Sequence, residues 1–91
     1  MKRKISFIIL NYNDADTTMK LADSLESWKC QKFNLNVVVV DNRSTDSSFT
    51  VLKNKYKNAI FTKVIQSEKN GGYSYGNNYG IKFAIKEYNP D

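Results

Sequence analysis

The polar and glycine residues that could form a ligand site fall in three short segments. Two of them, Asn11-Tyr12-Asn13 and Asp41-Asn42-Arg43-Ser44, each begin where an apolar run ends. The third, residues 70–80, contains all four glycines of the chain and leads into a helical pattern. Glycine permits close approach to the main chain, and the first amides of a helix attract phosphate. The third segment is therefore predicted to bind a phosphate, with a glycine-rich turn that has a flexible tip as the alternative.

Three apolar runs predict the strands that position these segments. They span residues 5–10, 37–40 and part of 60–66, where β-branched and aromatic residues cluster. Each is followed by helical spacing of apolar residues. The predicted apolar positions are Leu21, Ala22, Leu25 and Trp28 in the first helix, Phe49, Leu52 and Tyr56 in the second, and Ile81, Ala84, Ile85 and Tyr88 in the third. The predicted helix starts are Asp14 or Asp16 and Ser44 or Asp46, and Asn89-Pro90 ends the third helix.

The order βαβαβα predicts an α/β fold: a three-layer, Rossmann-like arrangement around a parallel sheet with crossover helices. Ligands of such open sheets bind beyond the carboxyl ends of the strands. All three polar segments follow predicted strands. They are therefore expected to meet along one edge of the sheet.

Composition limits the class of protein. The 91 residues suit a single small domain, and the net charge of +5 favours anionic partners, although the lysines are spread along the chain. With one cysteine and no histidine, neither an internal disulfide nor a Cys/His zinc site can form. The apolar run at residues 5–10 is too short for a secretory signal or a membrane span. A cytoplasmic location is therefore expected.

Several residue types in the three segments could contact a nucleotide. The Asp41 carboxylate could accept hydrogen bonds from a nucleobase or ribose, or it could cap the turn beside Asn42. Asn11 and Asn13 have the same two uses, ligand contact or support of a turn. Arg43 could pair with a diphosphate or remain solvated. The tyrosines that could stack on a base or a sugar are Tyr12, Tyr73 and Tyr75.

Three blocks together give the sequence a family resemblance. Residues 5–13, residues 38–46 and residues 70–81 resemble the amino-terminal half of a family 2 (GT-A fold) glycosyltransferase, in the family's order and separations. The resemblance implies a partial GT-A fold and a nucleotide-diphosphate-sugar site, in which Asp41 meets the base and the glycine segment borders the ribose and diphosphate. The implied binding residues are Asn11, Tyr12, Asn13, Asp41, Asn42, Ser44, Gly71, Gly72, Asn77, Asn78 and Gly80.

The sequence departs from the family pattern in two places. Asn77 stands where many members have an arginine, and the run from Gly72 to Asn78 is similar to a rhamnosyltransferase-type branch, which points to a thymidine- or uridine-linked donor. The family's acidic motif, which holds Mg²⁺ or Mn²⁺ on the donor diphosphate, would follow Asp91. Residues 1–91 are therefore expected to be one donor-nucleotide-binding domain, truncated before the metal ligands and the catalytic residues and inactive alone.

The resemblance implies that the parent enzyme transfers a sugar from a nucleotide-diphosphate donor to a hydroxyl of a glycan or lipid-linked acceptor, in cell-surface polysaccharide biosynthesis. Peripheral attachment at the inner membrane face is a second expectation for its location. A rival interpretation is a small basic α/β module that binds nucleotides or RNA without catalysis. A third is self-association into a homo-oligomer through an exposed sheet edge.

Overall fold

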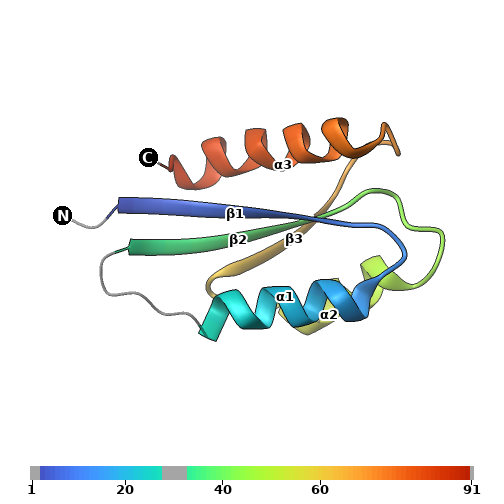
Figure 1. The fold of residues 1–91 in the computed structure, drawn as a ribbon, viewed down its shortest axis with the longest axis horizontal. Helices are drawn as coiled ribbons and strands as arrows, with labels where there is room; N and C mark the ends of the chain where they lie inside the picture. Colours follow the sequence, from blue (N-terminus) through green and yellow to red (C-terminus); the bar gives the residue numbers. More distant parts are fainter. Residues whose placement is uncertain (1–2, 28–32, 91) are drawn as a thin grey trace.

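A three-layer α/β fold is formed by residues 3–27 and 33–90, which the computed structural model describes (Figure 1). Its parallel sheet has the order β1 (Arg3–Asn11), β2 (Phe33–Asp41) and β3 (Thr62–Gln66). Helices α1 (Ala15–Ser27) and α2 (Ser48–Tyr56) cover one face, and α3 (Tyr73–Tyr88) covers the other. The predicted Rossmann-like βαβαβα class is confirmed. The predicted helix position Trp28 lies outside the described residues.

The valine run of β2 forms the centre of the structure. Val37, Val38, Val39 and Val40 are fully buried, because helices cover both faces and strands flank both edges. The strand is longer than predicted, since residues 34–36 belong to it and not to the preceding connection. Pairing with β1, residue for residue from Arg3 to Asn11, holds residues 34–36 in the sheet, including the polar Asn34 and Asn36.

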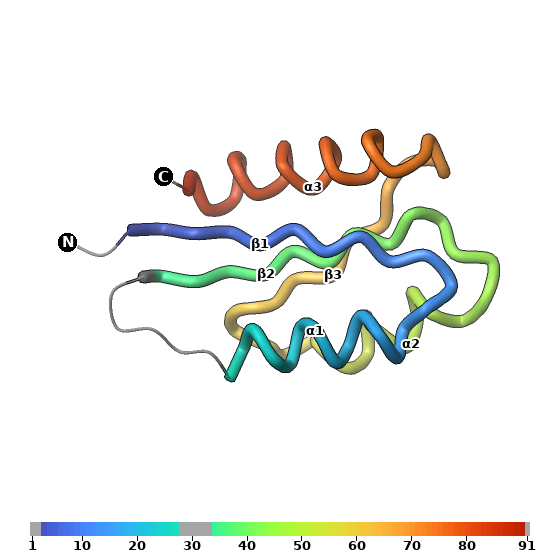
Figure 2. Tube along the Cα trace, viewed as in Figure 1, coloured from blue at the N-terminus to red at the C-terminus, as the bar shows by residue number. Residues whose placement is uncertain are grey.

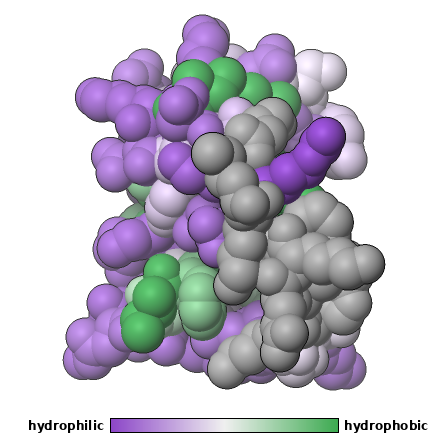
Figure 3. Space-filling model, turned by 90° about the vertical axis from the view of Figure 1, so that its left-hand side faces the viewer, coloured by the Kyte–Doolittle hydropathy of each residue, from purple (hydrophilic) through white to green (hydrophobic). Residues whose placement is uncertain are grey.

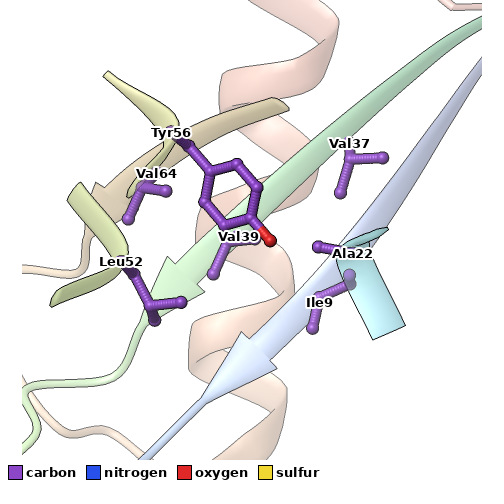
Figure 4. Close-up of a cluster of buried hydrophobic side chains, with 7 residues drawn as sticks. All are labelled: Ile9, Ala22, Val37, Val39, Leu52, Tyr56 and Val64. Atoms are coloured by element: carbon purple, nitrogen blue, oxygen red, sulfur yellow. The ribbon is translucent and has the colours of Figure 1, made fainter. Parts of the chain in front are cut away.

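The valines alternate between two hydrophobic clusters. Val37 and Val39 pack beneath α1 and α2, whereas Val38 and Val40 pack against α3 with Ala84. Figure 4 shows the first cluster, in which the Tyr56 ring enters from α2. Its members are Ile9, Ala22, Val37, Val39, Leu52, Tyr56 and Val64.

Two glycines of the third segment lie inside α3 and pack on the sheet. The helix begins at Tyr73, earlier than its apolar spacing predicts. Gly76, Gly80 and Ala84 form its buried stripe. A Cβ atom at Gly80 would lie 2.6 Å from Ile8 Cγ2 and 2.7 Å from Val40 Cγ2, and one at Gly76 would collide with the Leu10 side chain. The sheet therefore packs closely against Gly76 and Gly80.

Because of this contact, α3 buries a different face from the apolar face that its sequence predicts. Because the small residues of α3 face the sheet, Ile81 and Ile85 are 44% and 56% exposed, which corrects their prediction as core positions. Leu21 of α1 is likewise 48% exposed. Ile60 and Phe61 precede β3 and are exposed, because β3 starts only at Thr62. Apolar spacing thus identified the helices and the strand but did not fix which side chains they bury.

The predicted helix starts are decided by local hydrogen bonds. The Asp14 carboxylate accepts a hydrogen bond from the Thr17 amide at 3.4 Å, while Asp16 already lies in the first turn of α1. Asp46 accepts from the Ser48 amide at 2.8 Å at the start of α2. Ser44 does not cap this helix, because α2 begins only at Ser48.

The third helix ends where predicted. Asn89 adopts a left-handed conformation (φ 47°), and its amide donates to the carbonyls of Ala84 and Ile85. None of the described helices is both long and apolar enough to cross a bilayer.

Candidate functional site

The three polar segments meet at one end of the molecule, beyond the carboxyl ends of the strands. In Figure 2 the turns after β1 and β2 and the start of α3 all lie at that end. Asn42 Nδ2 donates to Asn70 Oδ1 at 3.1 Å and to the Gly72 carbonyl at 3.4 Å, which joins the second segment to the third. The predicted convergence of the three segments along one edge of the sheet is confirmed. We call this edge, formed by residues 11–13, 41–44 and 70–80, the rim. Ligand contact by any one residue stays a prediction.

Asn11 and Asp41 form the buried centre of this rim. They are paired across β1 and β2 and are 1% and 0% exposed. Asn11 Nδ2 donates to Asp41 Oδ1 at 2.9 Å, and Asn11 Oδ1 accepts from Thr18 Oγ1 of α1 at 2.6 Å. The Asn11 amide therefore connects both strand ends to the first helix, which is the turn-supporting role.

The Asp41 carboxylate is fully engaged by protein donors. Oδ1 accepts from Asn11 and from Ser44 Oγ at 2.5 Å. Oδ2 accepts from the Ser44 amide at 3.0 Å and from Gln66 Nε2 at 3.1 Å. Two donors on each oxygen satisfy a carboxylate. The structure thus shows Asp41 in the turn-capping role, with both oxygens bonded to protein donors, and the contact with a base that the resemblance implies stays a prediction.

The turns after β1 and β2 share a conformation and interlock. Asn13 and Arg43 both adopt left-handed backbone angles, with φ 52° and 59°. Asn13 Oδ1 accepts from the amides of Thr45 and Asp46 at 2.8 and 3.2 Å, and the Asn13 amide donates to Ser44 Oγ at 2.9 Å. Asparagine tolerates this conformation better than most residues. Asn13 therefore supports a turn, as predicted. Its side chain stabilises the turn after β2, however, and not the turn after β1 to which Asn13 belongs.

The Arg43 side chain connects the turn after β2 to the segment after β3. Its Nε donates to the Ser67 carbonyl at 2.7 Å, so the side chain spans from the turn after β2 to the residue after β3. Arg43 remains exposed overall. The guanidinium thus carries its positive charge on the rim while one of its donors is used internally.

Asn42 and Ser67 fix the loop that leads to α3. Both are buried, at 4% and 0% exposure. Ser67 Oγ lies 3.2 Å from Asn42 Oδ1 and 2.9 Å from the Lys69 carbonyl. Together with the Asn42 bonds to Asn70 and Gly72, these contacts set the position of the α3 start relative to β2.

The open part of the rim is formed by the exposed residues around the α3 start. Gly72 precedes the helix with φ 89°, a conformation that suits glycine, and no side chain of the described residues caps the first turn. Tyr12 and Tyr73 are 45% and 74% exposed. Uncapped amides at a helix start bind anions, and tyrosine rings stack on a base or a sugar. Gly71 and Asn78 are exposed and Asn77 is half-buried.

Tyr75 and Gly80 have structural surroundings. The Tyr75 ring packs on Gly71, where an added Cβ would lie 2.6 Å from Tyr75 Cγ, and Lys69 Nζ lies 5.3 Å from the ring centroid. Within the fold the Tyr75 ring thus contacts Lys69, and its stacking on a base or a sugar stays a prediction. Gly80 is buried against Ile8 and Val40, so packing accounts for its lack of a side chain.

A hollow of about 270 Å³ lies beside the rim, between the starts of α1 and α2. Its lining includes Asp14, Asp16 and Asp46. Hydrogen bonds from Ser48 lower the pKa of Asp46, which keeps the carboxyl charged. Because this hollow is acidic, the anionic part of a ligand is better placed at the α3 side.

A divalent cation does not fit the described residues. Among them, no group of three or more His, Cys, Asp or Glu side chains is placed to hold a metal ion. Asp41, the acidic residue at the centre of the rim, has both oxygens occupied. The expected Mg²⁺ or Mn²⁺ of the full-length enzyme stays a prediction.

Sequence reasoning missed the polar residues that support the rim from the side. Thr18 occupies a buried position of α1, Gln66 is the last residue of β3, and Ser67 follows it. The signal in the sequence was a polar residue at an otherwise apolar helix position for Thr18, and polar residues at the end of an apolar run for Gln66 and Ser67. The partners became evident only from the packed structure.

Comparison with known proteins identifies the family. The Glycosyl transferase family 2 model matches residues 6–88. The chain belongs to glycosyl transferase family 2. This match confirms the family resemblance of the three blocks.

The chain is also similar to part of two longer proteins. The chain is 35% identical over 88 residues to the poly(ribitol-phosphate) beta-glucosyltransferase of Bacillus spizizenii, covering 93% of this chain and 14% of that protein. It is 36% identical over 86 residues to the poly(ribitol-phosphate) beta-N-acetylglucosaminyltransferase TarS of Staphylococcus aureus, covering 93% and 15%. This family 2 chain thus spans a small fraction of either relative's length.

Proposed function

We propose that this family 2 chain forms the donor-nucleotide-binding portion of a glycosyltransferase. The observation that carries the proposal is the hydrogen-bonded joining of three strand-end segments on one rim, through Asn11–Asp41 and Asn42–Asn70. Ligands of open parallel sheets bind at this edge. A rim held by buried side chains also keeps its exposed residues in fixed positions, which lowers the cost of binding.

The exposed residues divide into two parts by chemistry. Tyr12, on the turn after β1, offers a ring for the base or ribose. The uncapped start of α3 at Gly72, with Arg43 and Lys69 nearby in the joined loops, offers amides and positive charge to the diphosphate. Asn11, Asp41 and Asn42 act indirectly, because they hold these groups in place.

The reaction proposed for the parent enzyme is substitution at the anomeric carbon of the donor sugar. The acceptor hydroxyl oxygen forms a bond to that carbon while the bond to the diphosphate oxygen breaks and the hydroxyl proton passes to a base. We assign the base and the metal ligands to further segments of a longer polypeptide. The chain of 91 residues would then bind the donor weakly and transfer nothing.

The relatives' names suggest the chemistry of both substrates. They are named for transfer of glucose or N-acetylglucosamine to poly(ribitol phosphate). We propose a hexosyl donor and a hydroxyl acceptor on a cell-surface polymer of this phosphate-linked polyol type. A thymidine-linked rhamnose donor, indicated by the Gly72–Asn78 pattern, is the alternative donor.

Chemical-shift titration of the 91-residue chain tests donor binding. UDP-glucose, UDP-N-acetylglucosamine, dTDP-rhamnose and an unrelated dinucleotide are added separately. We expect millimolar dissociation constants and shifts of the Tyr12, Asn13 and Gly72 amides. Tyr12→Ala should weaken binding about fivefold. Phe61→Ala, an exposed aromatic at the opposite end of β3, is the control and should leave it unchanged.

Two outcomes contradict the proposal. One is the absence of rim shifts at about 10 mM of every sugar nucleotide, a concentration that saturates a millimolar site. The other is RNA binding with a steep salt dependence and indifference to sugar nucleotides, which would favour the non-catalytic nucleic-acid module.

A further inference from the structure

The charges of the chain are divided between two sides of the molecule. Helix α1 packs on β1 and β2, and residues 14–27, which contain it, carry four carboxylates and one lysine. Helix α2 packs on β3, and residues 47–67, which contain both elements, carry four lysines and no carboxylate. The side of the molecule at β3 is therefore basic, whereas α1 is acidic.

Three of these lysines lie around the outer edge of β3. Lys53 Nζ donates to the Val64 carbonyl at 3.1 Å, so this lysine reaches the edge from α2. Lys57 is one helical turn further along the same flank of α2 and is exposed. Val64 packs in the cluster beneath α2, so Lys63, its neighbour in the strand, lies on the opposite face of the sheet and is exposed. Positive charge therefore flanks the edge of β3 on both faces.

Two exposed apolar side chains lie in the connection between Lys57 and Lys63. Ile60 is 80% exposed, the largest exposure among the apolar side chains that the structure describes, and Phe61 is 36% exposed. Both precede β3 and so belong to the end of the molecule where the strands begin. In Figure 3, which views this end, most of the described surface is hydrophilic and apolar side chains form only small patches. Contact of Ile60 with water is unfavourable.

A longer polypeptide would leave the β3 side uncovered by its next strand. The connections through α1 and α2 lie on one face of the sheet and lead from β1 to β3. Helix α3 lies on the other face, over β1 and β2. A right-handed connection through α3 therefore leads back across the sheet, and a following strand would join beside β1. The β3 side would remain the outer side of the larger sheet.

We infer that this basic face, formed by Lys53, Lys57, Ile60, Phe61 and Lys63, docks on a bilayer of anionic phospholipids. The lysines act as point charges toward the phosphates of the head groups, which needs no fixed geometry. Ile60 and Phe61 enter the boundary between head groups and acyl chains. A soluble polyanion would attract the same lysines but would leave Ile60 in water, so a bilayer fits the face better.

This docking is compatible with donor binding. Ile60 and Phe61 lie before the start of β3, whereas the rim lies beyond its end, so a docked chain still exposes the rim. The acidic helix α1 would be repelled by the bilayer, which favours a single orientation with the β3 side toward the lipid. The docking would thus hold the proposed donor site close to a membrane surface.

Cosedimentation of the 91-residue chain with lipid vesicles tests the inference. We expect a partition constant on the order of 10³ M⁻¹ for vesicles of equimolar phosphatidylglycerol and phosphatidylcholine. Binding should be more than about tenfold weaker to pure phosphatidylcholine, and it should weaken with added salt. Lys57→Gln and Ile60→Ser should each lower the constant about fivefold.

The matched controls lie on α1. Lys20→Gln and Leu21→Ser make the same changes at exposed positions of the acidic helix, and each should change the constant less than about twofold. Far-ultraviolet dichroism checks that all four variants fold.

Three outcomes overturn the inference. The first is no binding, or equal binding to both kinds of vesicle, at about 5 mM lipid, where a constant of the expected size binds most of the chain. The second is an equal loss of binding in the α1 variants. The third is unchanged vesicle binding by Ile60→Ser together with displacement by inorganic polyphosphate, which would assign the face to a soluble polyanion. Donor binding by Ile60→Ser should equal that of the unchanged chain, so failure of one proposal leaves the other intact.

Discussion

The Asn11 side chain donates a 2.9 Å hydrogen bond to the Asp41 carboxylate across the ends of β1 and β2, with both residues excluded from water. The Asn11 amide oxygen accepts from Thr18, and its NH2 group donates to Asp41 and, at 3.3 Å, to Ser44 Oγ. The acid and the amide are thus complementary. Their pairing keeps the two strand-end turns at a fixed separation, and the candidate site is built on those turns.

Asn11→Asp should destabilise the fold by about 2–4 kcal/mol, because it places a second carboxylate against Asp41 in a buried site and removes the donor. Urea unfolding at pH 7 measures the change. Adding Asp41→Asn reverses the donor and acceptor roles, so the double variant should regain about half of the loss. Additive losses in the double variant would show that the pair is not coupled.

Gly80→Ala should destabilise the chain by about 1–2 kcal/mol. The new methyl would lie 2.6 Å from Ile8 Cγ2 and 2.7 Å from Val40 Cγ2, and the overpacking cost exceeds the gain in helix propensity. Denaturant unfolding provides the measurement. Asn78→Ala, at an exposed position of the same helix, is the control and should be neutral or slightly stabilising. In a Val40→Ala background the Gly80→Ala penalty should shrink, and an unchanged penalty would argue against this contact.

Tyr56→Phe should remove part of the loss of stability at alkaline pH. Burial, followed by the 2.8 Å hydrogen bond to Asp23, raises the pKa of Tyr56 well above its ordinary value. As the pH rises above about 10, the unfolded chain releases this proton while the folded chain keeps it, so stability falls. The free energy of unfolding, measured from pH 8 to 11, should fall less steeply for the variant. Burial also raises the pKa of Tyr88, so a residual slope should remain in both proteins.

Lys55→Met should flatten the acid limb of the stability curve. The hydrogen bond from Lys55 lowers the pKa of Asp23 below its ordinary value, and the two side chains form a 2.6 Å ion pair between α1 and α2. The stabilisation is present above the ordinary pKa of Asp23 and is lost as the pH falls through the lowered value. Unfolding measured from pH 6 to 2 should show a smaller fall in the variant. Lys57→Met, an exposed lysine just after α2, serves as the charge-matched control.

The order of strands and helices could be predicted from the sequence, because it depends on local signals. Four successive valines require cover on both faces, and polar residues after each apolar run mark the strand ends. Parallel connection then places all those ends on one edge, which is why the convergence of Asp41 and Gly72 on one rim was predictable. The three blocks also identified the family, because their residues and their order can be read directly from the sequence without a structure.

The orientation of side chains was decided only by tertiary packing. Apolar spacing favoured Ile81 and Ile85 as the buried face of α3, yet Gly76 and Gly80 let the helix approach the sheet more closely, and that closer contact turned both isoleucines outward. The role of Asp41 depended on Ser44 and Gln66, which bring donors from two other places in the chain. A sequence determines which groups a chain can offer, whereas burial and the partners available in three dimensions determine which of them are used within the fold and which remain open to a ligand.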